Sequence, residues 1–550
     1  MGKFFDNLNL EEILHKLSSI EERLSKIEST LNIIPPKPEE EVLPIPAVQP
    51  QDEELEFRIG QFWAAKIGIV VLIIGFAFLL TLPYENLPAV LPSIVGYFCA
   101  VILFGLARLW RQSFSHLSGY LVGGGFVLLY LATMRLYFFT TDKALESFPL
   151  ILSLLIVVTI LSLIISVYRD SSYLALLGLI LGYATAVLSD YSYFIFIVNC
   201  ALAATVVLFK LKYNWNSLLF YGMFLTYLTH LLWFINNPLI GNIVQTVSEP
   251  ELNVLFILLY VLIFSYANLA TRLEAPEDFT FASSSLMNSS GGYGLLLLIT
   301  LLSTPAANTN FQFASAVVLL GTAITFWLRQ RSKYSTFFYA MFGYVAFSVA
   351  IIGQFEKPDY FIWLCWQSLL VISTAVWFRS KFIVLANFVI FLVIFAAYLI
   401  MGDITGGISI SFGLVALFSA RILNWKKDQL ELKTEQMRNA YLLSALFIIP
   451  YSLYQMFPSG YVSLTWIGIA IVYYILSILL KNKKYRWMAL ATYFLTVVYV
   501  FILGITSTET VFKIISFLVL GSALIIISLV YTKNKGKTKT EVIDKHESDG

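Results

Sequence analysis

Long apolar runs separated by short polar connections occupy the chain from about residue 62 to residue 531. About 20 apolar residues are enough for an α-helix to cross a membrane. The pattern predicts about 18 spans, at 62–81, 89–107, 117–137, 147–167, 172–189, 191–209, 216–235, 252–271, 283–303, 311–328, 335–354, 359–378, 382–400, 404–420, 439–457, 461–480, 485–504 and 511–531. An outer-membrane barrel would show short segments of alternating polarity instead. We therefore predict an all-α, polytopic transmembrane helical bundle.

An amphipathic helix is predicted before the first apolar run. Leucine and isoleucine alternate there at spacings of three and four residues, at Leu10, Ile13, Leu17, Ile20, Leu24, Ile27 and Leu31. A heptad pattern with Leu at a and Ile at d favours coiled coils of three or four strands. We predict that residues 1–34 form a cytoplasmic coiled coil that joins copies of the chain into a homo-oligomer. The alternative is a short helix on the membrane surface, because about three heptads are near the lower limit for an isolated coil.

Two further segments flank the apolar region. Residues 35–60 are acidic and rich in proline, which favours an extended linker that cannot build a core. Residues 532–550 form a lysine-rich tail for which we predict disorder. The multi-pass transmembrane domain is thus expected at 61–531.

The distribution of basic residues predicts the orientation. Every second connection between spans is basic, and together these connections contain 20 Lys and Arg residues, from Arg108 and Arg111 to Lys484 and Arg486. The other connections contain only Lys143, Lys357 and Lys513. Basic loops face the cytoplasm. Because the predicted number of spans is even, both termini are expected on the cytoplasmic side.

Composition excludes several classes of function. Only 13% of the 550 residues are charged and 58% are hydrophobic, whereas soluble domains carry about 25% charged residues. The three cysteines lie in apolar runs without CxxC spacing, so neither a disulfide nor a metal site is predicted. Phosphate-binding, zinc-protease and serine-hydrolase motifs are absent from the sequence. We therefore predict no catalytic residue, no metal and no cofactor, and an enzyme is less favoured than other functions.

Ionisable residues inside spans are costly in lipid, which makes them candidates for a site. Arg135, Asp190 and His230 fall near the non-cytoplasmic ends of their spans, and Glu85 lies just outside on the same side. One hypothesis places all four around a polar vestibule, in which Arg135 binds an anionic headgroup or pairs with Asp190, and His230 donates or accepts a proton. The other places each residue separately at the membrane interface, where such groups are tolerated.

One predicted span has a polar half. Between Phe281 and Thr304 the cytoplasmic half contains the run Asn288, Ser289, Ser290, Gly291 and Gly292. A break in a helix at such a place exposes backbone groups to substrate in many transporters. Small residues also allow neighbouring helices to approach closely, and this packing interpretation is the one we favour.

Four stretches carry a resemblance to a known family: WAAKIGIVVLIIGFAFLL (Trp63–Leu80), GYLVGGGFVLLYLATMRLYFF (Gly119–Phe139), LLGLILGYATAVLSD (Leu176–Asp190) and the run Lys212–Phe234. They resemble the family of predicted bacterial membrane proteins with domain of unknown function 2339. The resemblance implies a location in the bacterial cytoplasmic (inner) membrane, an N-terminal coiled coil, a proline-rich spacer and many helices. It implies no established activity.

Three functions are compatible with these features. The first is a self-associating membrane component related to the cell envelope. The second is a transporter or flippase-like protein for a lipid-linked or amphipathic solute, and the third is a membrane-embedded transferase. The expected partners are the lipid bilayer and further copies of the chain, without nucleic acid, and the sequence does not identify a substrate.

Overall fold

The computed structural model describes residues 64–81, 88–112, 115–139, 143–247, 249–271, 279–303, 308–401, 406–425, 434–459 and 461–502, together with residues 18–20, 26, 518, 521 and 522. These ranges contain seventeen α-helices. They are α3 (Ala64–Thr81), α4 (Leu91–Leu109), α5 (Ser115–Arg135), α6 (Phe148–Tyr168), α7 (Ser172–Ser189), α8 (Ser192–Tyr213), α9 (Asn216–Phe234), α10 (Asn253–Leu269), α11 (Phe279–Ser303), α12 (Asn308–Gln330), α13 (Lys333–Gln354), α14 (Tyr360–Trp377), α15 (Lys381–Met401), α16 (Gly406–Trp425), α17 (Thr434–Met456), α18 (Val462–Leu479) and α19 (Lys483–Ile502).

These helices match the apolar runs of the sequence. Thirteen of them, within the described part of the chain, are long and apolar enough to cross a membrane. α10 and the apolar part of α3, Ile67–Leu80, are shorter. The all-helical membrane fold is therefore confirmed, while the number of 18 spans remains a prediction. The last predicted span lies almost wholly outside the described residues, as do the linker and the tail.

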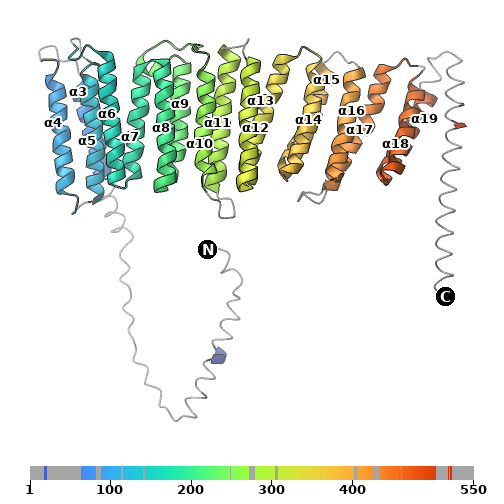
Figure 1. Ribbon diagram of the computed structural model, residues 1–550, viewed down its shortest axis with the longest axis horizontal. Coiled ribbons are helices and arrows are strands. Elements are labelled where there is room, and N and C mark those ends of the chain that lie inside the picture. Colours follow the sequence, from blue (N-terminus) through green and yellow to red (C-terminus); the bar gives the residue numbers. More distant parts are fainter. Residues whose placement is uncertain are drawn as a thin grey trace.

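The helices stand side by side in a narrow, elongated row, with α3 to α5 near one end and α18 and α19 near the other (Figure 1). Each helix packs mainly on helices that are one or two places away in the sequence. Buried apolar side chains follow the row, in one cluster that spans α3 to α7 and a larger one that extends from α7 to α19. The molecule thus resembles a repeat protein, in which neighbours supply most of the packing.

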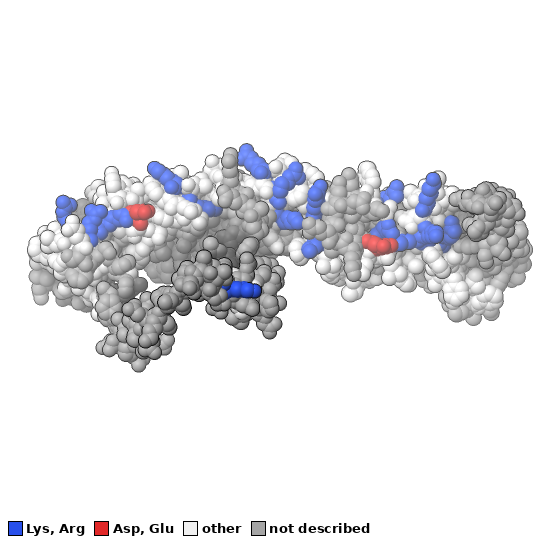
Figure 2. Space-filling view, turned by 90° about the horizontal axis from the view of Figure 1, so that it is seen from below, with Lys and Arg blue, Asp and Glu red and all other residues white. Residues whose placement is uncertain are grey.

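Lys and Arg side chains gather along one long face of the row, the face at which even-numbered helices end and odd-numbered helices begin (Figure 2). We name it the basic face, and it carries Arg108, Arg169, Lys212, Arg329, Lys333, Arg379, Arg421 and Lys484 at helix ends. Acidic side chains are much fewer on this face (Figure 2). The described basic residues of the alternating connections thus meet on a single surface.

Candidate functional site

A groove with a volume of about 430 Å³ lies between α12, α13 and α14, near the helix ends opposite the basic face. Its walls come from the start of α12, the end of α13 and the start of α14. They are Thr309, Asn310, Phe313, Phe347, Ala350, Ile351, Gln354, Phe355, Trp363, Trp366, Gln367 and Leu370. We name it the aromatic groove. Its volume falls within the range of about 300–1,000 Å³ that is usual for ligand sites.

Local packing explains why a groove forms here. α12 and α13 touch closely beside it, as shown by a Cβ added at Gly353, which would lie 2.6 Å from Thr309 Oγ1. After α13 the chain turns away at Phe355, which has extended backbone angles. The Phe355 ring stacks on Trp363 of α14, with centroids 4.9 Å apart. The two rings hold α14 away from the tight α12–α13 pair and form one wall of the groove.

The chemistry of the aromatic groove is amphipathic and uncharged. Asn310, Gln354 and Gln367 contribute amide groups, and no lining residue carries a charge. Phe313 and Trp363 are about half exposed, at 55% and 49%, so the groove opens sideways from the row. Such a site suits an apolar body with neutral hydrogen-bonding groups.

Arg135 and Asp190, two members of the predicted vestibule, have different partners. Arg135 ends α5 and is buried, and its guanidinium donates a hydrogen bond to the Leu80 carbonyl of α3. Asp190 follows α7 in left-handed conformation and is exposed. Its carboxylate accepts hydrogen bonds of 3.2 Å from the side chains of Asn237 and Asn242.

His230 is fully buried in α9. Its imidazole stacks on Phe196 at 4.8 Å and meets the edges of Trp233 and Tyr260. The Asn253 side chain lies nearby, but neither ring nitrogen has a hydrogen bond of ordinary geometry within the described part of the chain. The described members of the predicted vestibule thus lie in three separate surroundings rather than around one open cavity. Glu85 lies outside the described residues.

α11 is one continuous helix through Asn288–Gly292, without the break that the transporter interpretation requires. The serine hydroxyls donate to carbonyls one turn earlier, Ser289 to Ser285 at 2.8 Å and Ser290 to Leu286 at 2.7 Å, so these side chains are satisfied without a break. The two glycines allow close packing, since a Cβ at Gly292 would lie 2.3 Å from Val261 Cγ2. This close approach is what the packing interpretation requires.

Asn288 forms the centre of a buried hydrogen-bond network that joins four helices. Its Oδ1 accepts from the Tyr227 hydroxyl at 2.6 Å. Its Nδ2 lies within 2.7 Å of the Tyr339 hydroxyl, 2.9 Å of the Val261 carbonyl and 3.1 Å of Ser265 Oγ. Sequence reasoning identified Asn288 but missed Tyr227, Ser265 and Tyr339, because an isolated Tyr or Ser in an apolar run carries no periodic signal.

A second polar group lies nearer the basic face. Lys210, at the end of α8, donates to the Ala267 carbonyl at 3.1 Å and to Asn268 Oδ1 at 2.6 Å. Asn268 Nδ2 in turn reaches the hydroxyls of Ser284 and Ser285 at 2.8 and 3.1 Å. Lys210 therefore binds carbonyl oxygens at the end of α10, a favourable place for a cation.

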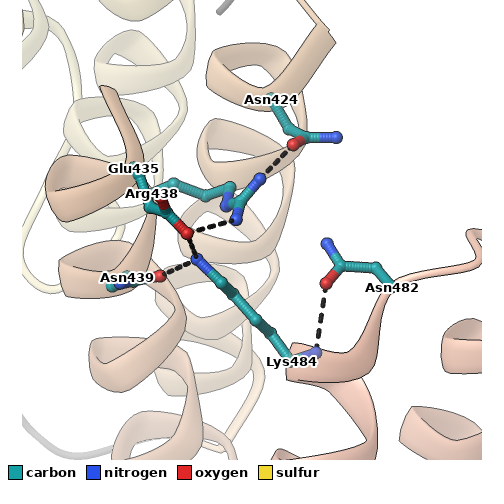
Figure 3. Close-up of polar contacts among 6 residues, drawn as sticks. All are labelled: Asn424, Glu435, Arg438, Asn439, Asn482 and Lys484. Atoms are coloured by element: carbon teal, nitrogen blue, oxygen red, sulfur yellow. Dashed lines mark hydrogen bonds and ion pairs between the residues drawn. The ribbon is translucent and has the colours of Figure 1, made fainter. Parts of the chain in front are cut away.

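Polar contacts on the basic face join α16, α17 and α19 (Figure 3). Glu435 lies 2.7 Å from Lys484 Nζ and 3.5 Å from Arg438. Lys484 also donates to Asn439 Oδ1 at 2.6 Å, and Arg438 donates to Asn424 Oδ1 (Figure 3). These contacts tie helix ends together and belong to the architecture rather than to a site.

Of the residues predicted for the coiled coil, the described part of the chain includes only Ile20, which is helical and exposed. The other six, Leu10, Ile13, Leu17, Leu24, Ile27 and Leu31, lie outside the described residues.

No curated protein and no solved structure matches the chain. A family model described as predicted membrane protein (DUF2339) matches residues 60–446, which include α3 to α16 and the first half of α17. This match covers most of the helical row, including the aromatic groove. The chain therefore belongs to the DUF2339 family of predicted membrane proteins.

Proposed function

We propose that this protein binds an amphipathic, lipid-like molecule in the aromatic groove and transports it within the membrane. The observation that carries the proposal is the groove itself, which combines aromatic walls, amide groups and a lateral opening. Its walls on α14 extend from Trp363 to Leu370, about 10 Å along the helix. This depth matches the outer part of one membrane leaflet, where Trp side chains are favoured.

The proposal includes an orientation. The basic face lies in the cytoplasm, which requires the aromatic groove to open into the opposite leaflet. The charge difference between successive connections supports this arrangement. The predicted 18 spans and two cytoplasmic termini agree with it, and the family resemblance favours the bacterial inner membrane.

The test is lipid binding by the purified, delipidated protein, measured by native mass spectrometry after titration with a glycolipid. Trp363→Ala combined with Phe313→Ala should remove one bound lipid at low ratios of lipid to protein, because both side chains form the walls of the groove. The control is Trp487→Ala, since Trp487 is 73% exposed on α19, away from the groove. Equal lipid binding by all three proteins would refute the proposal.

Self-association is the second proposal, and the heptad pattern at Leu10–Leu31 supports it. An oligomer held by an N-terminal coil would keep several rows together in one membrane area. This role agrees with an envelope-related component and does not conflict with lipid transport.

A further inference from the structure

A second cavity, of about 80 Å³, lies between α13, α14 and α15. Its lining includes Phe337, Tyr344, Ser348, Gln367 and Asn387. We name it the smaller groove. Gln367 lines both this groove and the aromatic groove. The two cavities therefore meet at one side chain on α14.

The two grooves lie at different heights along α13. α13 begins at the basic face with Lys333, and each residue advances the helix by about 1.5 Å. Along α13, the smaller groove extends from Phe337 to Ser348, about 6 to 22 Å from the first residue. The aromatic groove extends from Phe347 to Gln354, about 21 to 31 Å from it. Together they cover most of the length of the helix.

The grooves lie on opposite sides of the contact between α13 and α14. On α13, the aromatic groove uses Phe347, Ile351 and Gln354, whereas the smaller groove uses Tyr344 and Ser348. At 3.6 residues per turn these two sets point about 70° apart. The direct path from one groove to the other therefore passes between α13 and α14.

A few neutral hydrogen bonds close this passage. The Tyr344 hydroxyl is bonded to Thr374 Oγ1, and Ser348 Oγ donates to Gln367 Oε1 at 3.0 Å. Gln367 Nε2 donates to the Tyr344 carbonyl at 2.9 Å. Hydrogen bonds of this kind contribute little individually inside membranes. By contrast, α12 and α13 pack extensively, with Gly343 against Leu320, so α13 is expected to move together with α12.

The lining also restricts the ligand. Neither groove has a charged residue in its walls. A charged head would be left without a counter-charge there, at high cost in a membrane. Amide and hydroxyl groups at Gln354, Gln367, Ser348, Tyr344 and Asn387 instead offer partners for hydroxyl or amide groups of a ligand.

On the basis of the function proposed above, we propose that the contact between α13 and α14 is a gate. When it opens, the two grooves join, and a lipid with an uncharged, hydroxyl-rich head passes along Gln367 from one leaflet to the other. Its apolar chains stay in the surrounding bilayer. The hydrogen bonds of Gln367 re-form when the lipid has passed.

The experiment locks the gate. In a chain with Cys99, Cys200 and Cys365 replaced by Ala, Ser348→Cys and Gln367→Cys are joined by a short, cleavable thiol crosslinker. Proteoliposomes carry fluorescent glucosyl-diacylglycerol, and its transfer between leaflets is followed by chemical quenching of the outer leaflet. The crosslinked protein should transfer the lipid at least tenfold more slowly, and cleavage of the crosslink should restore the rate. The same protein before crosslinking is the control for folding.

Three outcomes separate the two proposals. An unchanged rate in the crosslinked protein overturns the gate and leaves lipid transport intact. No transfer by the protein that keeps Ser348 and Gln367 overturns lipid transport and the gate together. A photoreactive phenylalanine analogue in place of Phe337 or Trp363 then reports lipid in each groove, with Phe494, 71% exposed on α19, as the control position. Labelling at Trp363 without specific labelling at Phe337 supports binding and overturns passage through the smaller groove.

Discussion

The Asn288 amide of α11 donates a hydrogen bond of 2.7 Å to the Tyr339 hydroxyl of α13, and both side chains are buried inside the helical row. A polar group in this position has no water to bind if its partner is lost. The bond therefore holds α11 and α13 in a defined relative position, and the nearby Tyr227 extends the link to α9.

Removal of the Asn288 side chain should destabilise the protein. Asn288→Ala leaves the hydroxyls of Tyr227 and Tyr339 without this partner, and we expect a loss of roughly 1–3 kcal/mol in the free energy of unfolding. SDS-induced unfolding of the protein in mixed micelles measures this loss of free energy. Ser290→Ala is the control, because that hydroxyl bonds within its own helix, and it should change stability little. Equal stability of the two variants would show that the network contributes nothing.

Replacement by alanine should have opposite effects on stability at two glycines of α11. Gly292→Ala places a Cβ 2.3 Å from Val261 Cγ2, so α10 or α11 must shift, and we expect a loss of roughly 1–3 kcal/mol. Gly294 has no neighbour within 4 Å, and Gly294→Ala should be neutral or stabilising by up to about 1 kcal/mol because alanine favours helix. Thermal unfolding in detergent compares the stabilities of the two variants. A tolerated Gly292→Ala would contradict the close packing of α10 on α11.

Replacement of His230 by an apolar ring should not harm the fold. His230→Phe keeps the stacking on Phe196 and removes two buried nitrogens that lack a hydrogen bond of ordinary geometry among the described residues. We expect stability between unchanged and roughly 2 kcal/mol higher, because unsatisfied buried polar atoms are costly. A marked loss of stability would mean that the imidazole has a bound partner, such as the Asn253 side chain or water.

The ion pair between Glu435 and Lys484 should contribute little. Glu435 is 70% exposed, and exposed ion pairs are typically worth less than about 1 kcal/mol. A double-mutant cycle with Glu435→Gln and Lys484→Met should give a coupling below that value, and added salt should reduce it further. A coupling of several kcal/mol would contradict this prediction and would mean that the ion pair contributes strongly to the packing of α17 on α19.

Self-association should depend on the heptad positions. Leu17→Asp places a charge in the predicted seam and should convert the detergent-solubilised oligomer to monomer, as measured by light scattering. Lys26→Asp lies outside the seam and serves as the control. An unchanged mass for Leu17→Asp would rule out the coil as the source of assembly.

Hydropathy predicted the fold well, because every helix from α3 to α19 lies on a stretch that was expected to cross the membrane. The site was less accessible to sequence reasoning. Arg135 and His230 were identified as candidates because an ionisable side chain is energetically costly in lipid. In the structure, however, Arg135 donates a hydrogen bond to a backbone carbonyl, and His230 packs among aromatic rings. The aromatic groove depends on where the Phe355–Trp363 stack places α14, a tertiary detail that no periodicity records.

The order of contacts along the row bears on how the protein is made. Because helices pack mainly on those one or two places away in the sequence, each newly inserted helix finds its partners already in the membrane. A nascent chain that has inserted α9 into the membrane can therefore complete the core of α3 to α7 before α10 is inserted. Assembly proceeds from one end of the row to the other at the pace of translation, and a chain interrupted late in synthesis keeps a folded N-terminal part.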